Sequence, residues 1–280
     1  MMKKIVVFLL TCVLMLGTFG CGSAQQGTNS DGNSGQQTAK TDWDYIKDKG
    51  EMIIGITYYA PMNYKDSAGK LIGFETEFAE AVCTKLGVKA VFQEIDWNAK
   101  ETELNAKNID AIWNGMTKNE ERMKNMDFSL SYLNNRPVMI VRTADEEKYQ
   151  TPESLAGASV IAEAGSMAED IAKSDAFFAQ GKFTGVDTQI KAFLELKSKT
   201  ADVCVGDYVM AIGSLGAGTD FADLQVSKYK TFDPEEYGIG FRKGSVETLK
   251  QVNGAIEELK ASGELNTIAD HYKLTDLLIK

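Results

Sequence analysis

Short apolar runs alternate with segments of helical periodicity along most of the chain. The first such run after the N-terminal region, residues 51–56, has the length of a buried strand. After it, Phe78, Val82 and Leu86 recur at helical spacing and Gly87 ends the pattern, which predicts a helix with one apolar face. Further strand-like runs follow, separated by helical segments. This alternation indicates βαβ units and therefore an α/β fold with mostly parallel strands.

Two windows of the sequence, residues 101–115 and 193–207, share one pattern. Each runs from the end of a helix through a turn into a strand. The coinciding residues are Glu103/Glu195, Leu104/Leu196, Lys107/Lys199 and Asp110/Asp202. We interpret the two aspartates as turn or sheet-edge residues. The windows predict two lobes of similar construction, each presenting the carboxyl end of a strand, which is where ligands bind in open α/β sheets.

Two strand-like runs next to prolines predict the connections between these lobes. Pro137 opens one run and Pro234 precedes the other. Two antiparallel strands at these places would form a hinge, and the helical pattern after Gly244 would pack on lobe 1. We predict lobe 1 from residues 42–137 and 232–280, and lobe 2 from residues 138–231.

The N-terminal segment has the layout of a secretory signal. Residues 1–20 begin with lysines, continue with an apolar run too short to span a membrane comfortably, and end in small residues before Cys21. The "LGTFGC" stretch resembles a bacterial lipobox, which implies that Cys21 is acylated. The alternative is ordinary cleavage near Gly20 or Ala24 with a free cysteine. Residues 21–41 carry no large apolar side chain, so we predict a flexible linker that tethers the protein to the outer face of a bacterial cell membrane through lipid alone.

Charge and composition exclude several other classes of function. Signal removal takes away two lysines and leaves 28 basic against 40 acidic residues, a net charge of −12, which argues against nucleic acid or an anionic membrane surface as a partner. Cys83 and Cys204 are interpreted as small core residues. The single histidine, His271, leaves no histidine triad and no His/Cys metal site. We therefore expect no metal and no cofactor.

The stretch "NIDAIWNGMTKNEER" offers groups suited to one end of an amino acid. Gly115 lets the backbone approach a ligand closely, Thr117 adds a hydroxyl, and Arg122 supplies a planar fork for a carboxylate. Arg122 lies beside Glu120 and Glu121, so its alternative role is that of a solvated helix residue.

The second lobe offers complementary groups. Asp207 could meet an ammonium group, or cap the helix that follows it, or both. Gly165 and Ser166 precede a helix whose first free amides, around Met167 and Ala168, favour an anion. One site for a carboxylate and one for an ammonium group together predict that the ligand is an amino-acid zwitterion.

The motifs "GFETEFAEAVCTKLG", "IDAIWNGMTKNEERMKNMDFSLSY", "AGSMAEDIA", "ADVCVGDYVMA" and "YGIGFRKGS" together resemble the polar amino-acid-binding proteins of ABC importers. The resemblance runs from about Asp44 to Leu274. It implies the type II periplasmic-binding-protein fold, in which two Rossmann-like lobes are joined by a two-strand hinge.

The resemblance also implies a role for each candidate residue. Arg122 would clamp the α-carboxylate, helped by the loop amides near Gly165, Ser166 and Met167. Gly115, Thr117 and Asp207 would meet the α-ammonium group. Tyr59 and Trp97 would flank the ligand side chain; since neighbouring residues of a strand face opposite ways, we choose Tyr59 over Tyr58. Asn114 stands where the family commonly has Ser, and Met167 stands where it commonly has Thr or Ser. These differences leave the contacts to the α-carboxylate and the α-ammonium group intact. The side to which Trp113 points stays open.

These observations predict a monomeric, lipid-anchored extracytoplasmic receptor that captures a free L-amino acid and delivers it to the permease of an ABC importer. The "GITYYAP" loop is shorter than in basic-amino-acid receptors and brings no extra acid. A neutral polar substrate such as glutamine or cystine is therefore favoured, with arginine or lysine as the alternative. We expect no catalytic residues. The enzymatic alternative is a dehydratase-like catalyst that uses Glu163 or Asp96, and a third possibility is a sensor domain.

Overall fold

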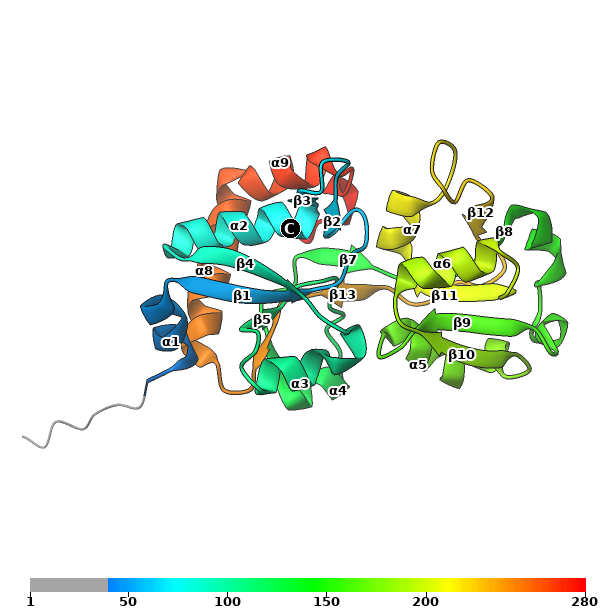
Figure 1. Cartoon of the computed structure of the whole chain (residues 1–280), viewed down its shortest axis with the longest axis horizontal. Helices are drawn as coiled ribbons and strands as arrows, with labels where there is room; N and C mark the ends of the chain where they lie inside the picture. The colour runs from blue at the N-terminus through cyan, green and yellow to red at the C-terminus, as the bar shows by residue number, and fades with distance from the viewer. Residues whose placement is uncertain (1–39) are drawn as a thin grey trace, which may run out of the picture. The chain divides into compact units, whose positions relative to one another are not determined.

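Two five-stranded sheets carry the architecture of residues 40–280, the part of the chain that the computed structural model describes (Figure 1). The predicted signal segment, the lipidation site Cys21 and nearly all of the predicted linker lie outside the described residues. Within residues 40–280, no helix is both long enough and apolar enough to cross a membrane.

The first sheet, with the helices around it, forms lobe 1. Its strand order is β4-β1-β5-β14-β6, with β4, β1 and β5 parallel and β14 antiparallel to β5 and β6. The strands are β1 (Glu51–Ile56), β4 (Lys89–Glu94), β5 (Ala111–Ile112), β6 (Met126–Phe128) and β14 (Gly240–Arg242). The helices are α1 (Asp42–Lys49), α2 (Phe74–Leu86), α3 (Lys100–Asn105), α4 (Glu120–Asn125), α8 (Val246–Ser262) and α9 (Glu264–His271), with the 3-10 turns η1 (Trp97–Ala99) and η5 (Thr275–Leu277). A small hairpin joins β2 (Tyr64–Lys65) to β3 (Leu71–Ile72).

The second sheet forms lobe 2 from one continuous stretch of chain. Its order is β10-β9-β11-β8-β12, with β10, β9 and β11 parallel and β8 antiparallel to both β11 and β12. The strands are β8 (Pro137–Arg142), β9 (Ser159–Glu163), β10 (Lys182–Val186), β11 (Val203–Asp207) and β12 (Leu224–Val226). The helices are α5 (Met167–Ser174), α6 (Gln189–Lys197) and α7 (Tyr208–Ser214), with 3-10 turns η2 (Thr143–Lys148), η3 (Pro152–Leu155) and η4 (Ala176–Phe178).

Two antiparallel strands connect the lobes; one follows Pro234, as predicted, but the other ends before Pro137, which opens β8 of lobe 2 instead. They are β7 (Leu133–Asn135) and β13 (Glu235–Tyr237), and they pair in register from Glu235 against Asn135 to Tyr237 against Leu133 (Figure 1). The chain leaves lobe 1 through β7 and returns through β13, so both ends of the described chain belong to lobe 1. The predicted lobe boundaries at 137/138 and 231/232 stay predictions.

The amphipathic helix predicted after the first strand is α2. Its apolar face packs on β4, α8 and α9, and the buried side chains include Phe78 and Val82. Gly87 ends it in the left-handed conformation, with a φ of 69°, and its amide donates to the carbonyls of Cys83 and Thr84. Cys83 and Cys204 are both buried and unpaired, as the interpretation of core thiols required.

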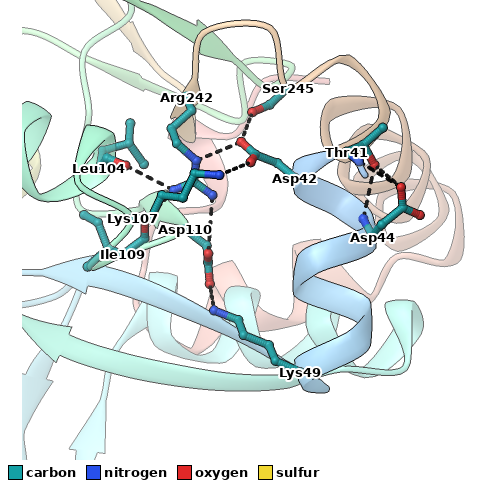
Figure 2. A network of polar contacts seen from close by, with 10 residues as sticks. All are labelled: Thr41, Asp42, Asp44, Lys49, Leu104, Lys107, Ile109, Asp110, Arg242 and Ser245. Atoms are coloured by element: carbon teal, nitrogen blue, oxygen red, sulfur yellow. Dashed lines mark hydrogen bonds and ion pairs between the residues drawn. The ribbon is translucent and has the colours of Figure 1, made fainter. Parts of the chain in front are cut away.

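The shared sequence windows correspond to an arginine clasp that occurs once in each lobe. In lobe 1, Arg242 Nη1 donates to the carbonyls of Leu104 (3.1 Å) and Ile109 (2.6 Å), and Nη2 reaches Asp110 Oδ1 at 3.4 Å (Figure 2). Asp110 Oδ2 in turn accepts from the backbone amide of Ile53 in β1 at 2.8 Å. The guanidinium Nε donates to Asp42 at the start of α1 at 2.7 Å. The clasp thus fixes the turn before β5 to a neighbouring strand and to α1.

Lobe 2 repeats the arrangement with Arg142. Its Nη1 donates to the carbonyls of Leu196 (2.7 Å) and Ala201 (2.6 Å), and its Nη2 lies 3.5 Å from Asp202 Oδ1. Asp202 Oδ2 accepts from the amide of Ser159 in β9 at 3.0 Å. The matching lysines of the two windows, Lys107 and Lys199, also adopt the same left-handed conformation, with φ values of 63° and 67°. Asp110 and Asp202 are therefore structural residues at the turns, as predicted, although their arginine partners were not foreseen.

Candidate ligand-binding site

One pocket lies where the carboxyl ends of β5, β9 and β11 face each other across the two lobes. Its cavity volume is about 20 Å³, about enough for one water molecule, so the side chains of the two lobes nearly fill it. Its lining comprises Tyr59, Trp97, Asn114, Gly115, Thr117, Arg122, Glu163, Ser166, Met167, Gln189 and Asp207. All the predicted substrate-binding residues except Gly165 line this pocket. Glu163 and Gln189 line it as well and were not among the predicted binding residues.

Gly115 provides the close backbone approach that the sequence predicted. It follows β5 with a φ of 58°, in the left-handed region that favours glycine, and a Cβ atom there would collide with the hydroxyl of Tyr59. Tyr59 is buried, and desolvation raises its pKa well above the usual value. Only glycine therefore allows Tyr59 to lie over the end of β5.

A buried carboxylate fixes the turn at Gly115 by accepting a hydrogen bond from its backbone amide. Glu75, in the first turn of α2, is 0% exposed and accepts from the Gly115 amide at 2.8 Å, from Asn63 at 3.1 Å and from the Tyr132 hydroxyl. Burial raises the pKa of Glu75 to about 7, and these hydrogen bonds act in the opposite direction. Asn63 also donates to Asn114 Oδ1 at 2.9 Å. This network was not predicted from the sequence, where its only signal is an acid at the apolar start of a helix.

Arg122 is a buried residue, so its alternative role as a solvated helix residue is wrong. It lies on α4, which Asn119 caps by accepting from the Arg122 amide at 2.8 Å, and it is 8% exposed. Its Nη1 donates to the Thr117 carbonyl at 3.0 Å, and its Nη2 lies 3.4 Å from the carbonyl of Gly165 in lobe 2. Burial lowers the pKa of Arg122, but an arginine stays charged in such a setting. The guanidinium therefore spans the cleft.

Asp207 is the last residue of β11, and side-chain amides hold its carboxylate. Its Oδ1 accepts from Asn135 Nδ2 at 2.8 Å, and Gln189, in the amide orientation that satisfies both groups, donates to Oδ2 at 3.2 Å. Asp207 occupies the N-cap position of α7, yet its side chain makes no capping hydrogen bond, so the capping alternative is wrong. Burial raises the pKa of Asp207, and the amides and Arg122 oppose that shift.

The connecting strands add a second carboxylate next to Asp207. Asn135 of β7 donates to Glu235 of β13 at 2.7 Å as well as to Asp207, and Thr117 Oγ1 donates to the same Glu235 oxygen at 2.9 Å. Burial and, after it, the charge of Asp207 raise the pKa of Glu235 to about 7. Asn135 and Glu235 were not predicted as site residues. Their positions beside Pro137 and Pro234 were the only hint in the sequence.

Glu163 ends β9 and points to the same pocket. It is 8% exposed, and burial followed by the charge of Asp207 raises its pKa to about 8. Asp96, the other acid considered for an enzymatic role, instead caps η1 by accepting from the Asn98 amide at 2.9 Å and does not line the pocket.

Gly165 turns its backbone toward lobe 1 instead of into the pocket. Its carbonyl accepts from Lys100 Nζ at 2.8 Å and faces Arg122, and its amide donates to Glu169 at 2.6 Å. Ser166 caps α5 by accepting from the Glu169 amide at 3.1 Å. The amide of Met167, in the first turn of α5, has no intrahelical acceptor, and the residue lines the pocket.

The aromatic residues divide between pocket and core. Trp97 lines the pocket, with Lys100 Nζ 4.9 Å from the centre of its ring. Trp113, left open by the sequence, is 0% exposed and packs edge-on against Phe78 at 5.0 Å between ring centroids. Tyr58 does not line the pocket, and Lys65 Nζ lies 4.5 Å from the centre of its ring. Trp113 is therefore a core residue.

Residues 52–275 match the family of bacterial extracellular solute-binding proteins, family 3. The chain belongs to this family. The L-cystine-binding protein TcyJ of Escherichia coli is 28% identical over 81% of this chain and 84% of its own length. The crystal structure of a mutant of ArgBP from T. maritima is 30% identical with a TM-score of 0.75, covering 82% of this chain and 98% of that one.

Another similar structure is the ancestral amino acid-binding protein AncCDT-1, described as a precursor of cyclohexadienyl dehydratase. It is 28% identical with a TM-score of 0.74 and covers 82% of this chain and 98% of that one. Other proteins that match are named for binding glutamine or were solved with bound histidine. The family assignment confirms the predicted fold: this family 3 chain has the two sheet-containing lobes of type II periplasmic binding proteins, and its relatives are amino-acid-binding proteins of ABC importers.

Proposed function

We propose that the chain is a lipid-anchored, monomeric extracytoplasmic receptor that captures a free L-amino acid between its lobes and delivers it to the permease of an ABC importer. The family assignment supports amino-acid binding and association with an ABC transporter. The lipid anchor rests on the predicted acylation of Cys21. The hinge would be the pair of strands β7 and β13, which alone connect the two lobes within residues 40–280.

The observation that supports this function best is that Arg122 and Asp207 come from different lobes and line one pocket. A guanidinium suits the α-carboxylate, and a carboxylate suits the α-ammonium group. The Met167 amide at the start of α5 would assist Arg122. Thr117 Oγ1 donates to Glu235, which leaves its lone pairs free to accept from an ammonium group. Tyr59 and Trp97 would flank the ligand side chain.

The side chain of the ligand is a separate question. The sequence favours a neutral polar amino acid such as glutamine or cystine, and arginine or lysine is the alternative. The names of the matching relatives include cystine, glutamine and arginine. Glu163 in the pocket is the observation that favours the basic alternative.

The enzymatic alternative is a dehydratase-like catalyst. It draws on the likeness to AncCDT-1 and on Glu163, whose pKa of about 8 suits an acid catalyst near neutral pH. We propose binding without catalysis. Incubation with candidate amino acids and carboxylate substrates, followed by mass analysis, should show no conversion.

Calorimetric titration with the common L-amino acids tests the proposal directly, using the protein and its Arg122→Ala variant. Removal of the charge partner of a desolvated carboxylate costs about 3–5 kcal/mol, so we expect a loss of affinity of at least about 100-fold. Arg136→Ala serves as the control, because Arg136 is an exposed arginine that does not line the pocket. Unchanged binding in Arg122→Ala, or the same loss in Arg136→Ala, would refute the proposed role of the clamp.

A further inference from the structure

We propose that Glu163 determines which ligand the pocket prefers, by receiving a guanidinium or ammonium group on the ligand side chain while Asp207 receives the α-ammonium group. The inference rests on the proposed function, since it assigns a second role within the same pocket. It reverses the substrate preference that the sequence suggested, because the loop of lobe 1 brings no extra acid but lobe 2 supplies Glu163.

The two carboxylates come from adjacent strand ends. β9 and β11 are parallel neighbours that pair at Val203 against Val160 and at Cys204 against Ile161, and Glu163 and Asp207 are their last residues. Both side chains line the pocket. A ligand held at one carboxylate therefore lies within reach of the other.

Among residues 40–280, these carboxylates have no ion-pair partner. Within residues 40–280, none of the ion pairs closer than 4.0 Å includes Glu163, Asp207 or Glu235. The charge of Lys100 lowers the pKa of Glu163, but its Nζ donates to the carbonyls of Trp97 (3.2 Å) and Gly165 (2.8 Å).

The surroundings of Glu163 explain why a cation would be favoured there. The charged groups that act on its carboxylate are Asp207 and Asp96, which are acidic, and Lys100, while the backbone N–H of Gln189 donates to it from the start of α6. Burial and the charge of Asp207 raise the pKa of Glu163 to about 8, which means that a second negative charge is disfavoured beside Asp207. A cation from the ligand would remove this penalty.

The charges of a zwitterion alone leave Glu163 unmatched. The α-carboxylate would take Arg122 and the α-ammonium would take Asp207, so a ligand with a neutral side chain has no charge left for Glu163. A guanidinium or ammonium side chain supplies it. Tyr59 and Trp97 line the same pocket, and aromatic faces attract such cations.

One other arrangement is compatible with the same geometry: Glu163 and Asp207 could share the α-ammonium group. The two arrangements predict different results for ligands of equal shape and different charge. If Glu163 receives the side chain, its removal weakens only cationic ligands. If it shares the α-ammonium group, its removal weakens all amino acids alike.

Calorimetric titration with matched ligands separates these cases. Arginine is compared with citrulline, in which a neutral urea group replaces the guanidinium, and lysine is compared with norleucine. In the unaltered protein we expect at least one cationic ligand to bind about 10-fold or more tightly than its neutral partner, since hydrogen bonds to charged groups are the strong ones. In Glu163→Gln we expect that ratio to fall to within about 3-fold while the neutral ligand keeps its affinity.

Glu153→Gln is the matched control, because Glu153 is an exposed glutamate of the same lobe. Thermal unfolding without ligand checks that Glu163→Gln folds. A measurement on the unaltered protein gives a second test that needs no variant. At pH 7, titrations in buffers of different ionisation enthalpy should show that the cationic ligand releases more protons on binding than its neutral partner, because pairing would require Glu163 to ionise.

The outcomes distinguish this inference from the proposed function. An equal loss for both ligands of a pair in Glu163→Gln, or equal proton release by both, overturns the role of Glu163. A protein that binds glutamine or cystine but neither arginine nor lysine also overturns it and leaves the proposed function standing. A protein that binds no amino acid refutes the proposed function and this inference together.

Discussion

The close approach of the two lobes depends on the absence of a side chain at Gly213. This glycine lies in α7 of lobe 2 and faces Pro61 of lobe 1. A Cβ atom at Gly213 would lie 2.5 Å from Pro61 Cδ, 2.8 Å from Pro61 N and 3.0 Å from the carbonyl carbon of Ala60. These neighbours are backbone and ring atoms that cannot rotate away. Gly213→Ala should therefore prevent the lobes from approaching this closely.

The size of the effect follows from these distances. Carbon atoms in contact lie about 3.5–4.0 Å apart, so the lobes would have to separate locally by about 1 Å. The hydrogen bond from Lys100 to Gly165 (2.8 Å) and the longer contact from Arg122 to the same carbonyl (3.4 Å) would then stretch beyond useful range. Overpacking of this kind costs about 1–3 kcal/mol. We therefore expect ligand affinity to fall by roughly 5- to 150-fold.

The same substitution should not destabilise the ligand-free protein. Gly213 lies within the helix α7 and does not have a positive φ. Replacing a glycine inside a helix by alanine contributes about 0.5–1 kcal/mol to stability. Binding and folding should thus change in opposite directions. Gly254→Ala is the control, since Gly254 lies in α8 and nothing lies within 4 Å of the position that its Cβ would occupy.

Calorimetric titration with the best amino-acid ligand and urea unfolding without ligand are the assays. Gly254→Ala should keep its affinity and gain a little stability. If Gly213→Ala bound the ligand as tightly as the unaltered protein, the contact with Pro61 would not limit closure, and the reasoning would be wrong. A loss of affinity accompanied by an equal loss of ligand-free stability would contradict it as well.

Two further predictions concern stability. Arg242→Met and Arg142→Met should each destabilise the protein by about 3–5 kcal/mol in urea unfolding, because each leaves a carboxylate and two carbonyls without their buried donor. Ligand affinity should stay within about 3-fold. A loss of stability below about 1 kcal/mol would contradict the structural role of the two arginines. The ligand-free protein should also lose stability as pH rises from about 5 to 8. The folded pKa values of Glu163 (about 8), Glu75 and Glu235 (both about 7) lie above the usual 4.5. The folded state therefore binds more protons than the unfolded state in this range. Each carboxyl lowers the free energy of unfolding by up to about 1.4 kcal/mol per pH unit. Urea midpoints that stay constant or rise between pH 5 and 8 would show that these carboxyls are not held protonated.

The sequence predicted those features that depend on local pattern. The run at residues 51–56 became β1 without change, and the apolar spacing of α2 and its stop at Gly87 were correct. The strand ends that offered polar groups, at Gly115 and at Asp207, do meet at one pocket. These predictions succeeded because periodicity, turn residues and the edge of a parallel sheet are properties of short segments.

The missed features depend on contacts between distant parts of the chain. Asn135 and Glu235 meet only because β7 pairs with β13, 100 positions apart in the sequence. Arg242 reaches the turn before β5 across 133 positions, so the sequence windows showed the aspartates but not the arginine. Trp97 lines the pocket and Trp113 lies in the core. This difference depends on residues from distant parts of the sequence, so a local pattern could not predict it.

The order of strands in lobe 1 has a consequence for synthesis. β14 comes from the last part of the chain, yet it lies between β5 and β6 and is the strand through which β6 joins the sheet. Lobe 2 is complete once β12 has emerged from the ribosome, whereas lobe 1 must keep a gap open in its sheet until residues 240–242 arrive. A chain that stops before β14 would carry a folded lobe 2 attached to an incomplete lobe 1. The sheet of lobe 1 would then have an unpaired strand edge that is open to aggregation.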